Sequence, residues 1–426
     1  MTRLAQWWRG FNDPALGSLI QRAAVSNRDL RAAEARVRIV RALRGVAAAD
    51  LLPTIDALAS YATARRSRNA LAFPVRLLDT GTYQAGFDAT WEFDLFGGKR
   101  RAVQAARADL QAVEEDRRAV LVSLLAEVAR DYIELRGTQR QLEIAEANLG
   151  AQREVLAISQ LRFAKGLVSE LDVAQAQALV AATRSVVPAL ETAIQHLIHR
   201  LSVLVGQPPG ALAAELSTGA AIPPVPPEVP AGLPADLLRS RPDVRRSERQ
   251  LAAANARIGV TTAELFPKFF LTGTAGYQSL SAANLISPAS KFWMAGPSLQ
   301  WRLLEYPRLR GQIRAADARQ DEALAQFEQT VLNALEEVEN ALAAYGKEKE
   351  RLAALRESAE ASRRAVALAN ELYTKGMGEF LNVLIAQRAL YQAEDAMVQS
   401  QKTVSENLVA LYKALGGGWQ TTSPPS

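Results

Sequence analysis

Two stretches of the chain alternate apolar and polar side chains with the period of two that is typical of a β-strand. In the first, the apolar positions are Tyr83, Ala85, Phe87, Ala89, Trp91 and Phe93. In the second, they are Trp293, Ala295, Pro297, Leu299, Trp301 and Leu303. A weaker strand pattern precedes each stretch, over residues 55–63 and 269–278, so we predict two β-hairpins.

The predicted strands are roughly ten residues long, which is enough to cross a lipid bilayer when a strand is tilted. We therefore expect the large apolar side chains of the alternating stretches to face lipid. They are Tyr83, Phe87, Trp91, Trp293, Leu299 and Trp301. The alternative, which the hairpins alone leave open, is a soluble protein in which this face packs against a core.

The remaining pattern is helical. After the turn at residues 94–99, a helix of about 67 residues, roughly 100 Å long, runs to Lys165. A shorter helix returns from Glu170 to Val205, and a helix over Ala15–Ala49, stacked on its end, would supply the missing length. The second half repeats this arrangement over residues 308–375, 379–415 and 235–264.

The two halves are copies of one unit. Lys165-Gly166 recurs as Lys375-Gly376, 210 residues later, and Trp91 recurs as Trp301 at the same offset. Helices packed in a coiled coil tolerate no net insertion, because one added residue rotates the apolar seam by about 100°. We therefore expect a tandem duplication. The first repeat spans residues 1–221, a Pro-rich connector 222–234, the second repeat 235–415 and a tail 416–426.

The amino-acid composition of the chain excludes several classes of function. The net charge is +5, with 50 basic and 45 acidic side chains interspersed along the helices, so nucleic acid is not an expected partner. The chain contains no cysteine, which excludes disulfides and thiolate metal sites. No apolar run is long enough for a transmembrane helix or a signal peptide, so any contact with a membrane is expected through the strands.

The sequence offers no active site. His196 and His199 are spaced to share one face of a helix, but no third ligand accompanies them, so we expect no metal. The acidic residues Glu336, Glu337 and Glu339 are interpreted as a solvated helix face. Nucleophile and phosphate-binding motifs are absent, and we expect neither an enzyme nor a cofactor.

Several motifs together resemble the TolC-type outer-membrane efflux proteins, in the OprM/NodT-like branch that serves resistance-nodulation-division pumps. They are Phe11-Asn12-Asp13-Pro14, Leu51-Leu52-Pro53, the Trp91–Gly97 segment, Leu238-Arg239-Ser240-Arg241-Pro242-Asp243, the two Lys-Gly turns and Ala414-Leu415-Gly416-Gly417-Gly418-Trp419. The resemblance implies a mainly α fold with a β-barrel part, in which long coiled-coil hairpins extend into the periplasm. It also implies a homotrimer whose chains each give four strands to a twelve-stranded outer-membrane barrel.

The same resemblance implies a passive exit duct for drugs or other small molecules. Its partners would be a periplasmic adaptor and an inner-membrane resistance-nodulation-division pump. The alternative functions are an outer-membrane channel for type I protein secretion and, from a different class, a soluble coiled-coil scaffold. A need for detergent would separate the duct from the scaffold.

Three features depart from the family pattern. Members of this branch usually begin with a signal peptide and a lipidated cysteine, which these 426 residues lack. The segment Trp301–Pro307 has no Gly-Gly turn before the second long helix. Carboxylates common after the second Lys-Gly turn are replaced by Asn382 and Ile385.

Two candidate sites follow for a duct of this kind. The hairpin tips are expected to dock on the adaptor, and they comprise Lys165, Gly166, Leu167 and Val168 with Lys375, Gly376, Met377 and Gly378. A gate is expected just past the second tip, where Leu381 and Ile385 share one helical face beside Asn382 and Glu379. The alternative is that Leu381 and Ile385 are ordinary seam residues packed within their own hairpin.

Overall fold

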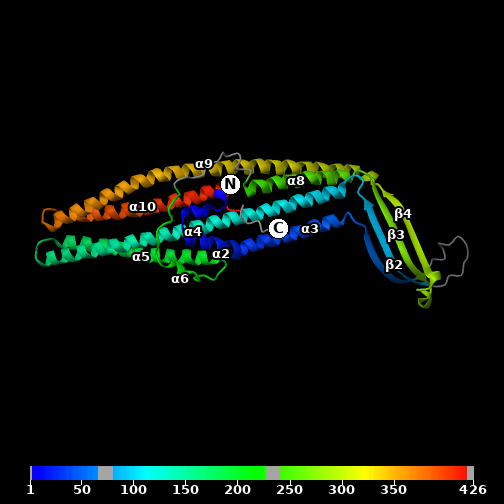
Figure 1. The fold of residues 1–426 in the computed structure, drawn as a ribbon, viewed down its shortest axis with the longest axis horizontal. Coiled ribbons are helices and arrows are strands. Elements are labelled where there is room, and N and C mark those ends of the chain that lie inside the picture. The colour runs from blue at the N-terminus through cyan, green and yellow to red at the C-terminus, as the bar shows by residue number, and fades with distance from the viewer. Residues whose placement is uncertain (1, 66–79, 227–239, 420–426) are drawn as a thin grey trace. The chain divides into compact units, whose positions relative to one another are not determined.

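The computed structural model describes residues 2–65, 80–226 and 240–419 (Figure 1). Its longer helices are α2 (Pro14–Ser26), α3 (Arg28–Ala49), α4 (Gly98–Ala164), α5 (Glu170–Leu204), α8 (Pro242–Ala263), α9 (Tyr306–Thr374) and α10 (Phe380–Ala414). Its strands are β1 (Thr54–Ala64), β2 (Thr80–Phe93), β3 (Lys268–Ser279) and β4 (Lys291–Gln300). Short turns of helix complete the described chain: α1 (Thr2–Ala5), η1 (Trp7–Phe11), α6 (Ala213–Leu216), η3 (Ala282–Asn284), η4 (Pro288–Ser290) and η5 (Leu303–Glu305). None of the helices in these ranges is long and apolar enough to cross a membrane.

The four strands form one antiparallel sheet in the order β1-β2-β3-β4 (Figure 1). The register places Phe87 opposite Ala57 and Ala275, and Ala275 opposite Trp293. Directly opposed residues lie on the same face of a sheet. The apolar positions of the two repeats therefore share one face, and both predicted hairpins are confirmed.

The second alternating stretch is shorter than predicted. We expected a strand through Leu303, but β4 ends at Gln300, and Leu303–Glu305 form the 3₁₀ turn η5 before α9 begins at Tyr306. The pattern predicted too long a strand because Trp301 and Leu303 continue the alternation after ladder pairing has stopped.

The helix predicted over Ala15–Ala49 is wrong, because the chain breaks at Asn27 between α2 and α3. The Asn27 backbone is extended, and its side-chain oxygen accepts a hydrogen bond from the Leu30 backbone N–H at 3.0 Å. Its amide Nδ2 donates to the Leu204 carbonyl oxygen at 2.9 Å. The end of α5 thus meets the start of α3, as the helix-stacking prediction required.

The second repeat has the same junction with different chemistry. Here Arg241, just before α8, donates from Nη1 to the Ala414 carbonyl oxygen at 2.7 Å, at the end of α10. The predicted start of this helix at Ala235 lies outside the described residues, as do connector residues 227–234 and tail residues 420–426.

The described residues divide between two compact units, each considered by itself. The first covers Met1–Ala35, Glu115–Arg245 and Gln329–Ser426, and the second covers Arg36–Glu114 and Arg246–Glu328. The first unit holds the main hydrophobic core, in which Phe11, Leu16, Tyr132 and Leu408 are at most 1% exposed. The second unit holds the sheet and the helix ends that lead into it.

Candidate gate and hairpin tips

Both hairpins reverse direction through the same turn. Gly166 and Gly376 have φ of 71° and 74°, in the left-handed region that favours glycine. In the first turn the Leu167 N–H donates to the Arg162 carbonyl at 2.9 Å, and in the second the Met377 N–H donates to Leu372 at 2.9 Å. These bonds close the end of each long helix in a Schellman-type cap.

The turns present their side chains to solvent. Leu167 is 69% exposed and Met377 is 67% exposed, and a Cβ added at Gly166 or Gly376 would meet no atom within 4 Å. Lys165 is exposed, and Lys375 forms an ion pair with Glu371 at 2.5 Å. Val168 and Gly378 are half-buried. The tips therefore offer open apolar contact flanked by lysines.

The return helices begin differently. The Ser169 hydroxyl oxygen accepts the Asp172 backbone N–H at 3.3 Å, and the Asp172 carboxylate accepts the Ser169 backbone N–H at 2.9 Å, which is a full capping box on α5. The equivalent cap of α10 is Glu379, whose side chain makes no capping bond. The first turn of α10 therefore lacks a side-chain cap that α5 has.

The second hairpin packs on the first through a small cluster near the tips. Tyr373, Phe380 and Val383 are at most 4% exposed and pack with Ala176 of α5. The Arg162 guanidinium lies over the Tyr373 ring at 4.3 Å. The Tyr373 hydroxyl is buried and has no hydrogen-bond partner in the described chain. A cleft lined by Arg162, Tyr373, Phe380 and Leu381 opens between the two turns.

The predicted gate residues lie outside this cluster. Leu381 is 50% exposed and Ile385 is 58% exposed, whereas Phe380 and Val383 of the same helix face inward. Asn382 and Glu379 are exposed as well. This exposure disfavours the alternative that Leu381 and Ile385 pack within their own hairpin, and their role as a gate stays a prediction.

The predicted lipid-facing residues gather on the apolar face of the sheet or just beyond it. Phe87, Trp293 and Leu299 are between 58% and 79% exposed. The Tyr83 ring packs at a tilt against Tyr61, with 4.5 Å between ring centroids, and Tyr83 is half-buried. Trp301 follows β4 rather than lying within it.

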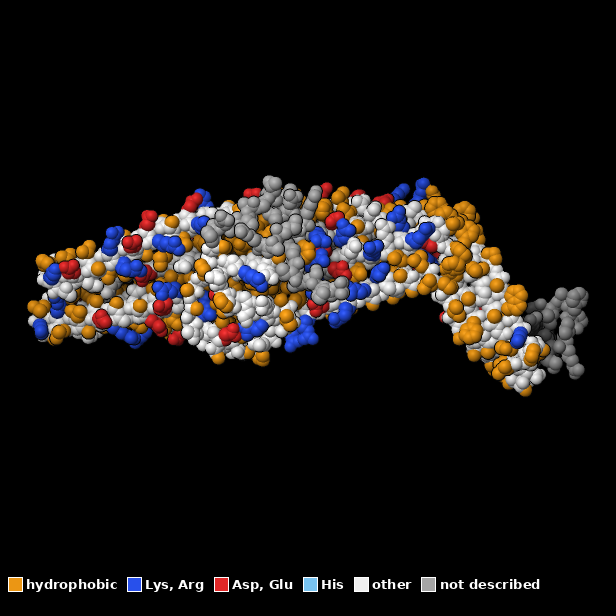
Figure 2. Space-filling model, in the orientation of Figure 1, with side chains coloured by type: hydrophobic (Ala, Val, Ile, Leu, Met, Phe, Trp, Pro, Cys, Tyr) orange, Lys and Arg blue, Asp and Glu red, His pale blue; other side chains and the backbone are white. Residues whose placement is uncertain are grey.

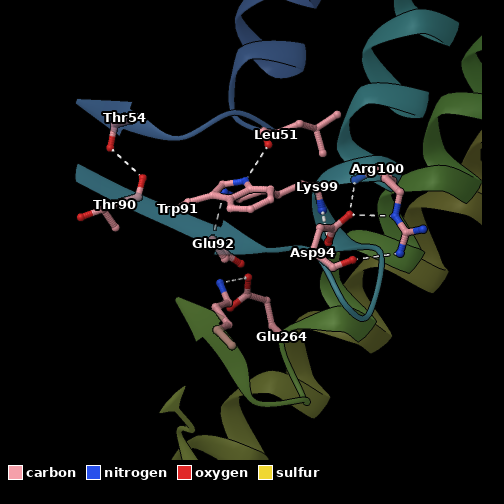
Figure 3. Close-up of polar contacts among 10 residues, drawn as sticks. Leu51, Thr54, Thr90, Trp91, Glu92, Asp94, Lys99, Arg100 and Glu264 are labelled. Atoms are coloured by element: carbon pink, nitrogen blue, oxygen red, sulfur yellow. Dashed lines mark hydrogen bonds and ion pairs between the residues drawn. The ribbon is translucent and has the colours of Figure 1, made fainter. Parts of the chain in front are cut away.

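The two repeat-related tryptophans share one contact. The Trp91 indole N–H donates to the Leu51 carbonyl oxygen at 3.0 Å, where α3 leads into β1 (Figure 3). The Trp301 indole N–H donates to the Leu265 carbonyl oxygen at 3.1 Å, where α8 leads into β3. Both tryptophans thus tie the end of a helix to the sheet.

Comparison with known proteins identifies this arrangement. The family model described as outer membrane efflux protein matches residues 19–207 and 233–417, which is most of the chain. The chain belongs to the outer membrane efflux protein family.

Among its relatives, the pyoverdine export outer membrane protein OpmQ of Pseudomonas aeruginosa is 35% identical, over 98% of this chain and 88% of that protein. The solvent efflux pump outer membrane protein SrpC of Pseudomonas putida is also 35% identical, over 97% of this chain and 87% of its own length. The solved outer-membrane channel OprN superposes with a TM-score of 0.94 at 39% identity, covering 98% of this chain and 93% of that one.

Membership of this family gives the location and the general activity of the protein. As an outer membrane efflux protein, the chain lies in the outer membrane with its helical part in the periplasm, and it serves as an exit duct for an efflux pump. The family consists of transport components, so the protein is not an enzyme. His196 and His199 are exposed, and the described ranges contain no group of three potential metal ligands.

Sequence reasoning missed one polar cluster in the helical part of this efflux protein. Lys402 of α10 is 5% exposed and contacts Glu134 of α4 at 2.8 Å. Burial, together with the adjacent Glu134 carboxylate, raises the pKa of Glu406 to about 8. No local spacing could have revealed this cluster, because Glu134 and Lys402 are 268 residues apart.

Proposed function

We propose that three copies of this chain form the outer-membrane duct of a tripartite efflux pump. The sheet supports this proposal because β1 and β4 are its two edges and its apolar face is exposed. Open sheet edges are not tolerated in lipid, so a chain with four strands must close a barrel with other copies. Three copies supply twelve strands, as the family resemblance implies.

We propose that the apolar face of the strands contacts lipid and that the opposite face lines the lumen. Asp56 and Asp88 lie directly opposite each other on that second face, and both are exposed. Two carboxylates opposed in this way repel each other, and water in a lumen screens the repulsion better than lipid.

The hairpin tips are proposed to dock on a periplasmic adaptor that connects the duct to an inner-membrane resistance-nodulation-division pump. The observation that carries this proposal is the paired exposure of Leu167 and Met377 on turns of identical geometry. Exposed apolar side chains on a rigid turn favour contact with another protein. The adaptor side is expected to be helical, like the tips themselves.

The cargo is proposed to be small organic molecules. The relatives are named for export of pyoverdine, solvents and toluene, all of which are small compared with a protein. The pump supplies the energy, while the duct lets the cargo pass passively.

The docking proposal is tested by the double variant Gly166→Glu/Gly376→Glu, in cells that carry the native pump and adaptor. The variant is expected to assemble and reach the outer membrane but to lose export, because one glutamate charge now lies beside the exposed apolar side chain of each tip. The matched control is Gly166→Asn/Gly376→Asn, since asparagine tolerates the left-handed conformation without adding charge. Full export by the charged variant would contradict docking at the tips.

A further inference from the structure

The two repeats differ where each long helix begins. Before α4, the Asp94 carboxylate accepts the backbone N–H groups of Lys99 and Arg100 at 3.0 and 2.8 Å (Figure 3). The position 210 residues later is Leu304, whose side chain is 97% exposed. An acid that caps a helix is thus replaced by a leucine with almost no protein contact.

Leu304 is part of a larger apolar surface. Leu303 is 63% exposed, Trp301 53% and Tyr306 48%. Phe96 of the first repeat stacks on Phe266 of the second at 4.5 Å between ring centroids, and both rings remain partly exposed. Figure 2 shows hydrophobic side chains gathered where the helices lead into the strands. Exposed apolar surface of this kind marks a contact with something other than water.

The pairing register of the strands shows that these side chains lie next to the apolar face of the sheet. Leu299 lies opposite Phe269, and Phe269 lies opposite Phe93, on the apolar face of the sheet. Trp301 lies two residues after Leu299, just past the helical end of β4, and is 53% exposed. Tryptophan indoles are enriched at the boundary between lipid and water. Since the helical part is periplasmic, this end of the strands meets the periplasmic leaflet.

Basic side chains follow the apolar turn directly. The Arg310 guanidinium lies over the Tyr306 ring at 4.8 Å and is exposed. Within the described ranges it has no carboxylate partner, whereas Arg308 pairs with Glu305. An arginine held one helical turn beyond apolar side chains can reach lipid phosphates while they contact acyl chains.

We propose that the segment Leu303–Tyr306 inserts into the periplasmic leaflet of the outer membrane, with Leu304 at the boundary between acyl chains and headgroups and Arg310 against a lipid phosphate. The occupant of this surface is therefore phospholipid rather than a second copy of the chain. In the first repeat, the position of Leu304 is held by Asp94, whose carboxylate caps α4 instead. The inference rests on the proposed barrel.

The test exploits the absence of cysteine from the chain. A spin label is attached to Leu304→Cys in the full-length protein, reconstituted in vesicles of phosphatidylethanolamine and phosphatidylglycerol. Its collisions with oxygen, which partitions into lipid, are compared with collisions with a water-soluble nickel chelate. Trp293→Cys is the lipid control and Lys347→Cys is the water control, since their side chains are exposed on strand and helix, respectively. Leu303→Cys provides a second label within the turn.

The proposal expects the labels at 303 and 304 to favour oxygen severalfold, as at 293, and Arg310→Gln to shift the label at 304 toward water. A nickel-accessible label at 304 beside a lipid-exposed label at 293 would overturn the insertion while leaving the barrel intact. Shielding from both reagents, with dipolar broadening between labels, would assign the surface to a second copy instead. Nickel access at both 293 and 304 would contradict the barrel as well.

Discussion

The side chains of Asn27 and Arg241 donate hydrogen bonds to equivalent backbone carbonyl groups in the two repeats. Asn27 donates to Leu204 at 2.9 Å and Arg241 donates to Ala414 at 2.7 Å. The donors are 214 residues apart and the acceptors 210, which are the offsets that separate the repeats. Duplication has therefore preserved the junction between a return helix and the next short helix, while a neutral amide in one copy is a guanidinium in the other.

This junction predicts unequal costs of mutation. Asn27→Ala is expected to lower the free energy of unfolding by about 1–3 kcal/mol, because it leaves the buried Leu204 carbonyl without a donor. Arg241→Met should cost more, about 3–5 kcal/mol, because Arg241 is 6% exposed and also pairs with Asp243 and Glu337 at 2.6 and 2.7 Å. Denaturant midpoints of the assembled protein in detergent measure both.

The control for Asn27→Ala is Asn148→Ala, since Asn148 makes an amide-to-carbonyl bond of 2.9 Å within its own helix. Its loss should shift the midpoint only slightly, because the Ile144 carbonyl keeps its helical environment. Equal shifts of the denaturant midpoint from Asn27→Ala and Asn148→Ala would show that the bond at the junction stabilises the protein no more than a bond within a helix.

The facing of the strands predicts opposite responses at adjacent residues. Phe87→Arg should destabilise the protein in lipid vesicles by about 2–4 kcal/mol, because it places a charge on the lipid face. Asp88→Asn should have little effect or stabilise slightly, since Asp88 lies opposite Asp56 and the change removes a like-charge pair. Unfolding in vesicles measures the difference in stability between the two variants. Comparable losses of stability from both substitutions would contradict the assignment of the lipid and lumen faces.

The half-buried pair of Glu134 and Glu406 predicts that stability depends on pH. Burial, then the hydrogen bond and charge of Glu134, raise the pKa of Glu406 from 4.5 to about 8, against the lowering effects of Lys402 and Arg130. The folded protein therefore binds this proton more tightly than the unfolded chain. The resulting stability is fully present below the unfolded pKa and is lost as pH rises through about 8.

Denaturant midpoints between about pH 5 and about pH 8 should accordingly fall for the unmodified protein. Glu406→Gln should flatten this slope, because the neutral amide cannot ionise, while Glu360→Gln on an exposed position leaves it in place. If the denaturant midpoint of the Glu406→Gln variant still falls with pH, the titrating group is not Glu406.

The sequence predicts local periodicity well and long-range polar contacts poorly. The alternation around Phe87 fixed the strands and their common face, and the Lys-Gly repeats located both turns at Gly166 and Gly376. The break at Asn27 escaped prediction because the deciding partner, Leu204, lies on another helix. The end of β4 escaped because its partner strand β3 begins at Lys268, opposite Gln300, so the alternation at Trp301 continues beyond the last paired residues. Glu406 was missed for the same reason as Asn27: its environment is assembled from α4 and α10.

The proposed gate rests on the exposed pair Leu381 and Ile385, which face away from the buried Phe380 and Val383. In a trimer, three copies of each would converge into an apolar ring that excludes water and ions by dewetting. Asn382 adds no charge there, and Glu379 is the nearby acid on the same turn. Divalent cations on the periplasmic side should therefore block the channel poorly.

Planar-bilayer recordings of the purified protein test the gated duct most directly. The unmodified channel is expected to conduct weakly, and Leu381→Ser/Ile385→Ser is expected to raise the single-channel conductance severalfold by wetting the ring. Leu171→Ser, at the repeat-equivalent exposed position of the first hairpin, serves as the matched control and should leave conductance unchanged. Unaltered conductance in the double variant, or strong divalent block of the unmodified channel, would contradict an apolar gate at Leu381 and Ile385.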